Sequence, residues 1–270
     1  MRRSLLGLAA IALLAVAATA ISAHDLFIKL DSYFVPPGTA IRVPIINGTF
    51  ELSENSITAD RVTDVSIFNE GGLRGIRQED WDADGDTTFL ALRTGDPGTY
   101  VLGISTLPRS LALAATDFNE YLAHDGIPDV LAQRERDGEL ERDVVEQYSK
   151  HVKAVFQVGE ARTGGLDRVL GHPAELIPVG NPYDHAPGDE FAFRALVDGD
   201  PVAGQLVLAG GQGAHGPFEE RSARTDARGE VRFGIDEPGR WYIKFINMKK
   251  TTLEGVDYES KWATLTFEVR

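Results

Sequence analysis

The chain of 270 residues contains six histidines and no cysteine. Zinc–thiolate, iron–sulfur and cysteine-nucleophile chemistry are therefore excluded, because each of them needs a thiolate. A transition-metal site would have to combine imidazole nitrogens with carboxylate oxygens. The residues from which such a site can be built are His24, His124, His151, His172, His185 and His215. Of these, His124 and His172 lack the spacing of metal ligands.

His24 follows a segment that is typical of a secretory signal peptide. Residues 1–23 begin with two arginines, continue with an apolar run over residues 5–18 and end in small residues. This is the order of the charged, hydrophobic and cleavage regions of a signal, and the apolar run is short for a membrane span. We therefore expect residues 1–23 to be removed and the mature protein to be periplasmic or secreted. Retention of the segment as a membrane anchor is the alternative.

The position of the cut decides whether an N-terminal chelate exists. Cleavage after Ala23 would make His24 the first residue, so that its α-amine and its imidazole could bind one ion together. An α-amine ordinarily has a pKa of about 7.7–8.0 and an imidazole a pKa of about 6.5. Nitrogen ligands of this kind suit Cu(II) or Ni(II). Cleavage after Ala20, at a second A-x-A site, would leave Ile21 first and remove the chelate.

One chelating residue needs further ligands from the fold. We expect at least one of His151, His185 and His215 to complete the site, with Asp25 or Asp257 as an oxygen donor. Each histidine also has an alternative role. His151 could be a surface residue of a helix, His185 could cap a turn, and His215 could belong to a mobile connector or flap over residues 210–216.

The composition is that of an acidic globular protein. Apolar residues make up 43% of the chain, so a packed core is expected. The formal net charge is −14, and it becomes −16 once Arg2 and Arg3 are removed with the signal. This charge argues against nucleic acid and anionic membrane surfaces as partners and is compatible with the attraction of cations. An exported protein without disulfides must be held together by its core.

Short segments of alternating apolar residues predict a mainly β protein, with two immunoglobulin-like antiparallel β-sandwiches joined by a helical segment. In the first segment, residues 24–107, the alternation occurs at residues 26–30, 41–45, 65–67 and 99–104. In the last segment, residues 164–270, strands are expected over residues 174–179, 191–197, 205–208, 230–235, 241–246 and 263–269. Trp241 and Trp262 are expected in the core of this last sandwich.

The middle segment, residues 108–163, shows helical spacing. Apolar residues in the stretches 118–122 and 144–156 recur at intervals of three and four. Breaks are expected at residues 126–128 and near Gly138. We therefore predict a connector of two or three helices.

Residues 80–86 have acidic side chains at alternate positions, like the first half of a calcium-binding loop. An EF-hand loop needs Glu at its twelfth position, which Ala91 occupies here. We therefore expect an acidic hairpin turn before a strand over residues 88–92, with calcium binding as the alternative.

Motifs of common enzyme classes do not occur in the sequence. The glycine-rich stretch 210–213 lacks the Gly-Lys-Ser/Thr of a phosphate-binding loop, and no Gly-x-Ser-x-Gly is present. The 41 acidic residues offer no means of choosing a glycosidase pair. A copper oxidase with an N-terminal histidine would need a second histidine in the copper plane. The sequence thus favours a binding protein over an enzyme.

Five spaced stretches carry a resemblance over essentially the whole mature chain. They are residues 23–28, 118–122, 148–151, 174–182 and 259–267. They resemble a bacterial family of exported proteins, a domain of unknown function filed with nickel and cobalt uptake accessory components. The resemblance implies a periplasmic β-rich protein that presents a divalent metal, with His24 as the leading ligand and a membrane transporter component as a partner. In one departure, Asn247 stands where similar members often have histidine.

From these observations we expect a periplasmic protein that binds Ni, Co or Cu through His24 and acts in metal uptake or handling. The alternative is a metal-free β-sandwich module that binds a protein or carbohydrate partner at the cell envelope. In that case His24 would be incidental, and the acidic surface or residues 210–216 would make the contacts. Metal in the purified mature protein distinguishes the two.

Overall fold

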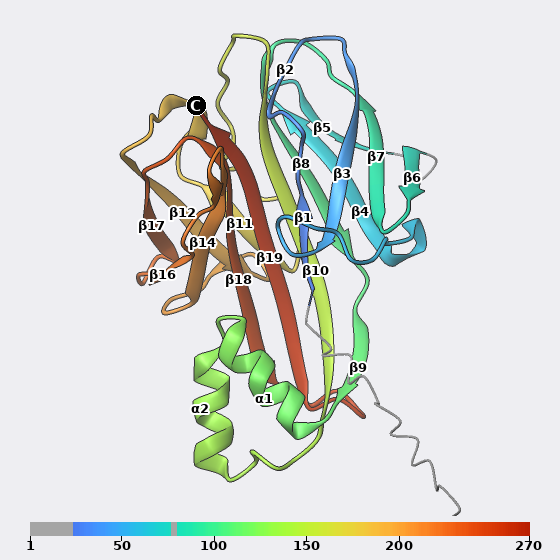
Figure 1. Ribbon diagram of the computed structural model, residues 1–270, viewed down its shortest axis with the longest axis vertical. Coiled ribbons are helices and arrows are strands. Elements are labelled where there is room, and N and C mark those ends of the chain that lie inside the picture. Colours follow the sequence, from blue (N-terminus) through green and yellow to red (C-terminus); the bar gives the residue numbers. More distant parts are fainter. Residues whose placement is uncertain (1–23, 77–79) are drawn as a thin grey trace, which may run out of the picture.

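The computed structural model describes residues 24–76 and 80–270 of the chain. The predicted signal segment, residues 1–23, lies outside the described residues. Within these ranges the protein is built mainly of β-strands in several largely antiparallel sheets, with two α-helices at one end (Figure 1). The prediction of a mainly β protein is confirmed. No helix in the described ranges has the length and apolar character needed to span a membrane.

A four-stranded antiparallel sheet, sheet A, contains strand β1, which follows His24. Its order is β1-β3-β7-β6, and its strands are β1 (Asp25–Ile28), β3 (Ala40–Gly48), β7 (Thr87–Arg93) and β6 (Trp81–Asp84). The turn between β6 and β7 holds Gly85 and Asp86, so the predicted acidic hairpin is confirmed. The alternation predicted near residues 26–30 and 41–45 places Leu26, Ile28, Val43 and Ile45 in the core.

The central sheet, sheet B, has eleven strands drawn from all three predicted segments. Its main path is β15-β14-β18-β19-β10-β8-β4-β5, while β16 pairs with β14, and β2 and β9 pair with β10. The strands are β2 (Phe34–Val35), β4 (Val62–Asn69), β5 (Gly72–Gly75), β8 (Gly98–Thr106), β9 (Arg109–Leu113), β10 (Val144–Val158), β14 (Leu206–Gly213), β15 (Gly216–Pro217), β16 (Arg221–Arg224), β18 (Gly239–Lys250) and β19 (Tyr258–Val269). The β10–β19 and β10–β2 pairs are parallel.

A third sheet, sheet C, comes from the last segment. It contains β11 (Ala174–Pro178), β12 (Asp189–Val197), β13 (Asp200–Pro201) and β17 (Glu230–Ile235), with β12 at its centre. The strands predicted over residues 174–179, 191–197 and 230–235 correspond to β11, β12 and β17. Those predicted over residues 205–208, 241–246 and 263–269 lie in β14, β18 and β19 of sheet B.

The two larger cores lie on opposite faces of sheet B. Sheet A covers one face, where Leu102 of β8 and Phe156 of β10 pack with Leu26 of β1. Sheet C covers the other face, where Val155 of β10 packs in the same cluster as the side chains of β18 and β19. Trp241 lies in this second core, as predicted, whereas Trp262 is buried in a third cluster beside the helices. Strand β10 therefore contributes alternate side chains to both larger cores.

The helix predicted over residues 144–156 is wrong, because these residues form the 15-residue strand β10. The apolar residues Val144, Tyr148, Val152 and Phe156 are four apart, and this spacing fits one face of a strand as well as one face of a helix. The other face of β10 is also buried over the second half of the strand. The sequence of that half therefore lacks the alternation of apolar and polar residues that marks a half-exposed strand.

The remaining part of the predicted connector does form helices. Helix α1 (Ala115–His124) and helix α2 (Pro128–Asp137) are separated at Gly126 and Ile127, as predicted. Gly138 ends α2 in the left-handed conformation that favours glycine. The two helices lie beside the end of sheet B at which β10 and β19 begin and β18 ends (Figure 1). Two short 3-10 helices, η1 (Ala59–Arg61) and η3 (Pro182–Asp184), complete the named elements.

A buried ion pair joins sheet B to sheet C. The Lys153 ammonium on β10 contacts the Glu175 carboxylate on β11, and the two side chains are 3% and 1% exposed. The carboxylate also accepts the backbone N–H groups of Leu170, Gly171 and His172 at 2.7–2.9 Å. Burial lowers the pKa of Lys153, whereas the pKa of Glu175 is lowered by Lys153 and these hydrogen bonds although burial opposes this.

We predict that Lys153→Met lowers the free energy of unfolding by about 3–5 kcal/mol, because it leaves a buried carboxylate without its counter-charge. Lys250→Met is the matched control, since Lys250 is exposed and pairs with Asp137 and Glu139 at the surface. Its loss should cost about 0–1 kcal/mol. Urea denaturation of both variants checks this, and equal losses would contradict the role assigned to burial.

Candidate functional site

The position of His24 is set by strand β1. In the antiparallel pairing of β1 with β3, Asp25 lies opposite Gly48 and Leu26 opposite Asn47. On the side of β1 that does not pair with β3, the Thr264 hydroxyl on β19 donates a hydrogen bond to the Leu26 carbonyl at 2.8 Å. His24 therefore directly precedes a strand that is held from both sides, so its backbone has a defined place next to sheet B.

The loop after β3 brings Glu54 to His24. A Cβ at Gly48 would collide with the carbonyl oxygen of Leu52, so the tight path of this loop requires glycine. The backbone N–H of Glu54 then bonds to the Asn47 carbonyl at 3.0 Å. Since Asn47 pairs with Leu26, this bond places Glu54 beside the start of β1.

The His24 side chain is surrounded by polar groups and reaches solvent. Its Nδ1 lies 3.3 Å from Glu54 Oε2, and 27% of the side chain is exposed. Its Nε2 lies 3.5 Å from Asn55 Nδ2. The His24 carbonyl accepts a hydrogen bond from the Lys150 ammonium on β10. The imidazole and the Glu54 carboxylate thus form a two-residue donor set at the surface.

Asp25 is engaged by another partner. Its Oδ2 lies 2.7 Å from the Lys244 ammonium on β18, and Glu220 Oε2 lies 3.5 Å from the same ammonium. Although burial lowers it, these two carboxylates raise the pKa of Lys244 above its ordinary value. Asp25 therefore neutralises a half-buried lysine, which reduces its availability as a metal ligand.

His151 faces the opposite side of sheet B from His24. Lys150 points to His24, and the next side chain along β10 must point the other way. The His151 ring lies between the hydroxyls of Ser105 at 2.9 Å and Ser149 at 3.0 Å. Burial lowers its pKa to about 3, so it is a neutral, hydrogen-bonded core residue.

His185 and His215 lie elsewhere. His185 is the C-cap of η3, with Nδ1 3.8 Å from Asp189 Oδ2 and its ring against Phe191. His215 is exposed in the turn between β14 and β15. The alternative role proposed for His185, at the end of a turn, matches this geometry.

The mobile connector predicted over residues 210–216 is wrong for most of its length. Residues 210–213 belong to strand β14, and Gly210 and Gly211 are buried. A Cβ at Gly210 would collide with the Tyr242 hydroxyl, and one at Gly211 with the Arg240 carbonyl. The glycines therefore allow β14 to pack closely against β18 rather than form a flap.

The predicted ligands do not form one cluster. In residues 24–76 and 80–270, no group of three or more His, Asp or Glu side chains is placed to hold a metal ion. The structure instead brings Glu54 to His24, which the sequence analysis missed. Glu54 carries no local signal, because its place depends on the pairing of β1 with β3 and on the loop at Gly48. If residues 144–156 had been assigned to a strand, period-two spacing would have identified Lys150 as a residue that faces away from His151.

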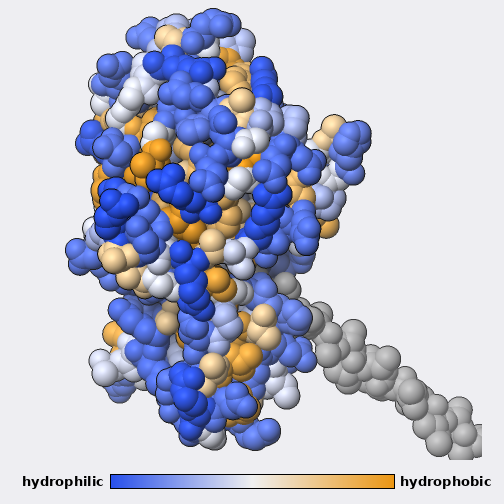
Figure 2. Space-filling view, turned by 90° about the vertical axis from the view of Figure 1, so that its left-hand side faces the viewer, coloured by the Kyte–Doolittle hydropathy of each residue, from blue (hydrophilic) through white to orange (hydrophobic). Residues whose placement is uncertain are grey.

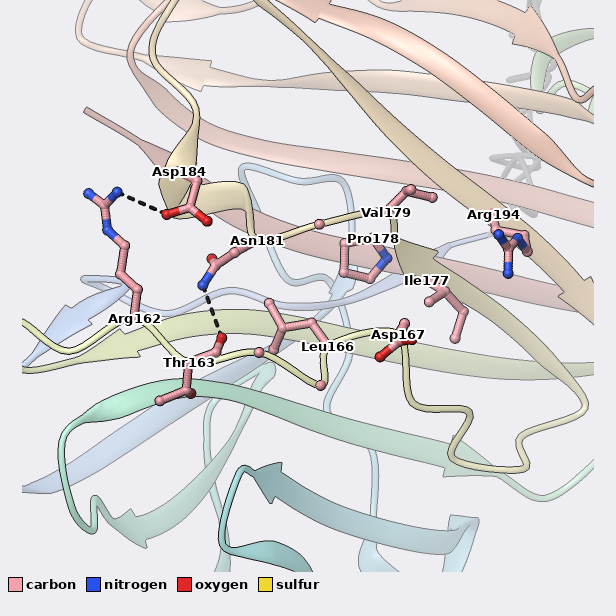
Figure 3. A pocket seen from close by; sticks show the side chains of 13 residues that line it. Arg162, Thr163, Leu166, Asp167, Ile177, Pro178, Val179, Asn181, Asp184 and Arg194 are labelled. Carbon is pink, nitrogen blue, oxygen red and sulfur yellow. Dashed lines mark hydrogen bonds and ion pairs between the residues drawn. The ribbon is translucent and has the colours of Figure 1, made fainter.

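A groove lies at the other end of the molecule, beside strand β11. It has a volume of about 550 Å³, with Leu166, Ile177 and Pro178 on its apolar side. Figure 3 shows the ion pair of Arg162 with Asp184 at one end of the groove, and Arg194 at the opposite end. Arg162 also borders a neighbouring pocket of about 870 Å³ that includes Phe34.

On the face shown in Figure 2, hydrophilic residues predominate and hydrophobic ones form small patches.

The comparisons with known proteins identify a family and no activity. The model of a family described as Domain of unknown function (DUF4198) matches residues 21–249. Among curated proteins there is no significant match.

The chain also shows weak similarity to solved structures. Trypsin-activated alpha-2-macroglobulin from Escherichia coli is 10% identical with a TM-score of 0.23, and the match covers 91% of this chain and 16% of that one. The D0-D1 domain of Intimin is 10% identical with a TM-score of 0.20, covering 90% and 97%. A tetra-tandem repeat of a large adhesion protein is 12% identical with a TM-score of 0.23, covering 91% and 49%. At these TM-scores the similarities support no argument about function.

Asp125, which follows helix α1, belongs to the charge cluster around Asp25. Burial and the nearby Asp25 carboxylate raise the pKa of Asp125 to about 6, against an ordinary value of 3.8. The folded state therefore favours protonated Asp125. This stabilisation is fully present below pH 3.8 and is lost as the pH rises through 6.

We predict that Asp125→Asn stabilises the protein relative to the parent chain by about 1–3 kcal/mol at pH 7.5, because the amide carries no charge to desolvate. At pH 4 the difference should shrink towards zero, since Asp125 is then mostly protonated. Denaturation of the two proteins across this pH range measures it, and a difference independent of pH would refute the assignment.

Proposed function

Because the chain belongs to the DUF4198 family, whose description assigns no activity, we propose from its geometry that it is an exported divalent-metal-binding protein. The proposed metal is Ni(II), Co(II) or Cu(II), and the proposed site is the N-terminal residue His24 with Glu54. The observation that carries the proposal is the 3.3 Å approach of His24 Nδ1 to Glu54 Oε2 at the start of a firmly held strand.

Cleavage after Ala23 gives this site three donor atoms. The His24 α-amine and Nδ1 can close a chelate ring on one ion, and a Glu54 oxygen can take a third position. Two nitrogens with one carboxylate oxygen suit Cu(II) and Ni(II), and water can complete the coordination. Because 27% of the His24 side chain is exposed, a metal has access to the ring from solvent.

The proposed setting is the cell envelope. The signal-like residues 1–23 and the resemblance to nickel and cobalt uptake accessory proteins support it. The two larger cores on opposite faces of sheet B support a description of the scaffold as two immunoglobulin-like sandwiches that share β10. The exposed site would allow the protein to buffer metal or hand it to a membrane transporter component.

The proposal predicts that protein exported through its own signal has the mass of a chain that begins at His24. This protein should bind Ni²⁺ or Cu²⁺ at micromolar concentration or below. A variant whose mature chain begins at Ile21 should lose this binding, because its α-amine is displaced from the ring. Intact mass and titration calorimetry measure both. At a hundredfold excess over the dissociation constant, metal should stabilise the fold by about 2.7 kcal/mol. A chain that begins at Ile21, or one that binds no metal, would overturn the proposal.

We predict that Glu54→Gln weakens metal binding about tenfold, because a neutral amide replaces an anionic ligand. Glu51→Gln is the matched control, since Glu51 lies exposed in the same loop. His151→Ala should leave the affinity unchanged while lowering stability, because His151 is buried on the opposite face of the sheet. Equal affinities for the Glu54 and Glu51 variants would argue against Glu54 as a ligand.

The alternative function is a metal-free module that binds a protein or carbohydrate partner. The two neighbouring pockets that share Arg162 favour it, because together they could hold an extended ligand. This alternative expects Arg162→Ala to abolish partner binding, whereas metal binding at His24 would be unaffected by that change.

A further inference from the structure

His24 also lines a pocket, together with Asn55 of the loop that carries Glu54. Its volume is about 450 Å³, and its wall includes Arg61, Arg109, Tyr148 and Lys150. Arg61 ends η1, and its carbonyl accepts the Leu107 N–H at 2.8 Å. Arg109 lies opposite Tyr148 in the β9–β10 pair. Backbone pairing therefore holds these side chains around one space.

The charge of this pocket is the reverse of the charge of the protein. Over the whole chain, 41 acidic residues outnumber 27 lysines and arginines. The pocket wall instead has two arginines and one lysine against a single carboxylate, that of Asp60. Such a local excess of positive charge in an acidic protein attracts a small anion.

The two guanidinium groups are available to a ligand. Within the described part of the chain, Arg61 and Arg109 form no ion pair, and their side chains donate no hydrogen bond to protein. Lys150 donates to the His24 carbonyl and to Asn47 Oδ1, which leaves one of its three donors. Arginine binds carboxylates with two parallel hydrogen bonds, and the Tyr148 ring offers an apolar surface beside them.

We propose that this pocket binds a small organic anion with two or three carboxylates. A volume of about 450 Å³ suits a molecule of this size. One carboxylate would bind the guanidinium groups, and another would extend to His24. This inference does not depend on the proposed metal site, because the pocket is described by its own residues and volume.

A polycarboxylate fits this position better than inorganic phosphate. The arginines and His24 come from different elements of the pocket wall, so an anion that contacts both needs acceptor oxygens at separated points. We therefore expect a preference for citrate or succinate over phosphate.

The test is calorimetric titration of citrate, succinate and phosphate into metal-free protein that begins at His24. Citrate should bind, and Arg61→Gln and Arg109→Gln should each weaken it about tenfold, because each removes a charge-assisted contact. Arg228→Gln is the control, since Arg228 is exposed and lies in the turn before β17. Glu54→Gln should retain citrate binding while it loses metal affinity.

Three results would overturn the inference: no citrate binding by the metal-free protein, unchanged affinity in both arginine variants, or phosphate bound as tightly as citrate. Thermal unfolding shows whether each variant is folded. Arg109 lies exposed at the start of β9, so its variant tests the pocket even where Arg61→Gln disturbs the fold. Failure of metal binding with intact citrate binding would refute the proposed function alone.

Discussion

The buried contact between Lys153 and Glu175 is the constraint on which the arrangement of the sheets depends. Two charges removed from water are tolerated only when each finds counter-charge and hydrogen bonds. Glu175 accepts from Lys153 and from three successive backbone N–H groups, so the loop over residues 170–172 must fold around its carboxylate. The contact thereby fixes where β11, and with it sheet C, meets the second half of β10.

Once β10 is fixed, its alternation decides which polar residues can meet. Lys153 and His151 face sheet C, while Lys150 faces β1 and reaches the His24 carbonyl. A histidine at an odd position of β10 therefore cannot join a site on the side of His24. The candidate site therefore combines His24 with Glu54 from the loop after β3, and not with a histidine of β10.

The sequence was informative where the signal was local. Alternation predicted β11, β12, β17 and β18, and the residues around Pro128 and Gly138 predicted the limits of α2. It failed for β10, because an interval of four residues fits both periods and both faces of the strand are buried. It also failed for Glu54 and Arg61, whose approach to His24 depends on pairings between distant segments. Residues 210–213 were misread because glycines that permit close packing have the same composition as glycines in a loop.

A terminal residue is ordinarily the least ordered part of a chain, and a ligand built from it must be immobilised when metal binds. If His24 is the terminal residue, as proposed, much of that ordering is already present in the fold. The Thr264 hydroxyl and Lys150 hold the carbonyls of Leu26 and His24, and β3 holds the other edge of β1. In the proposed site, the entropy of fixing the His24 backbone would therefore be lost during folding and not at binding, which favours a site built from two residues. Anchoring of β1, more than the number of histidines, is what makes His24 the best candidate in this chain.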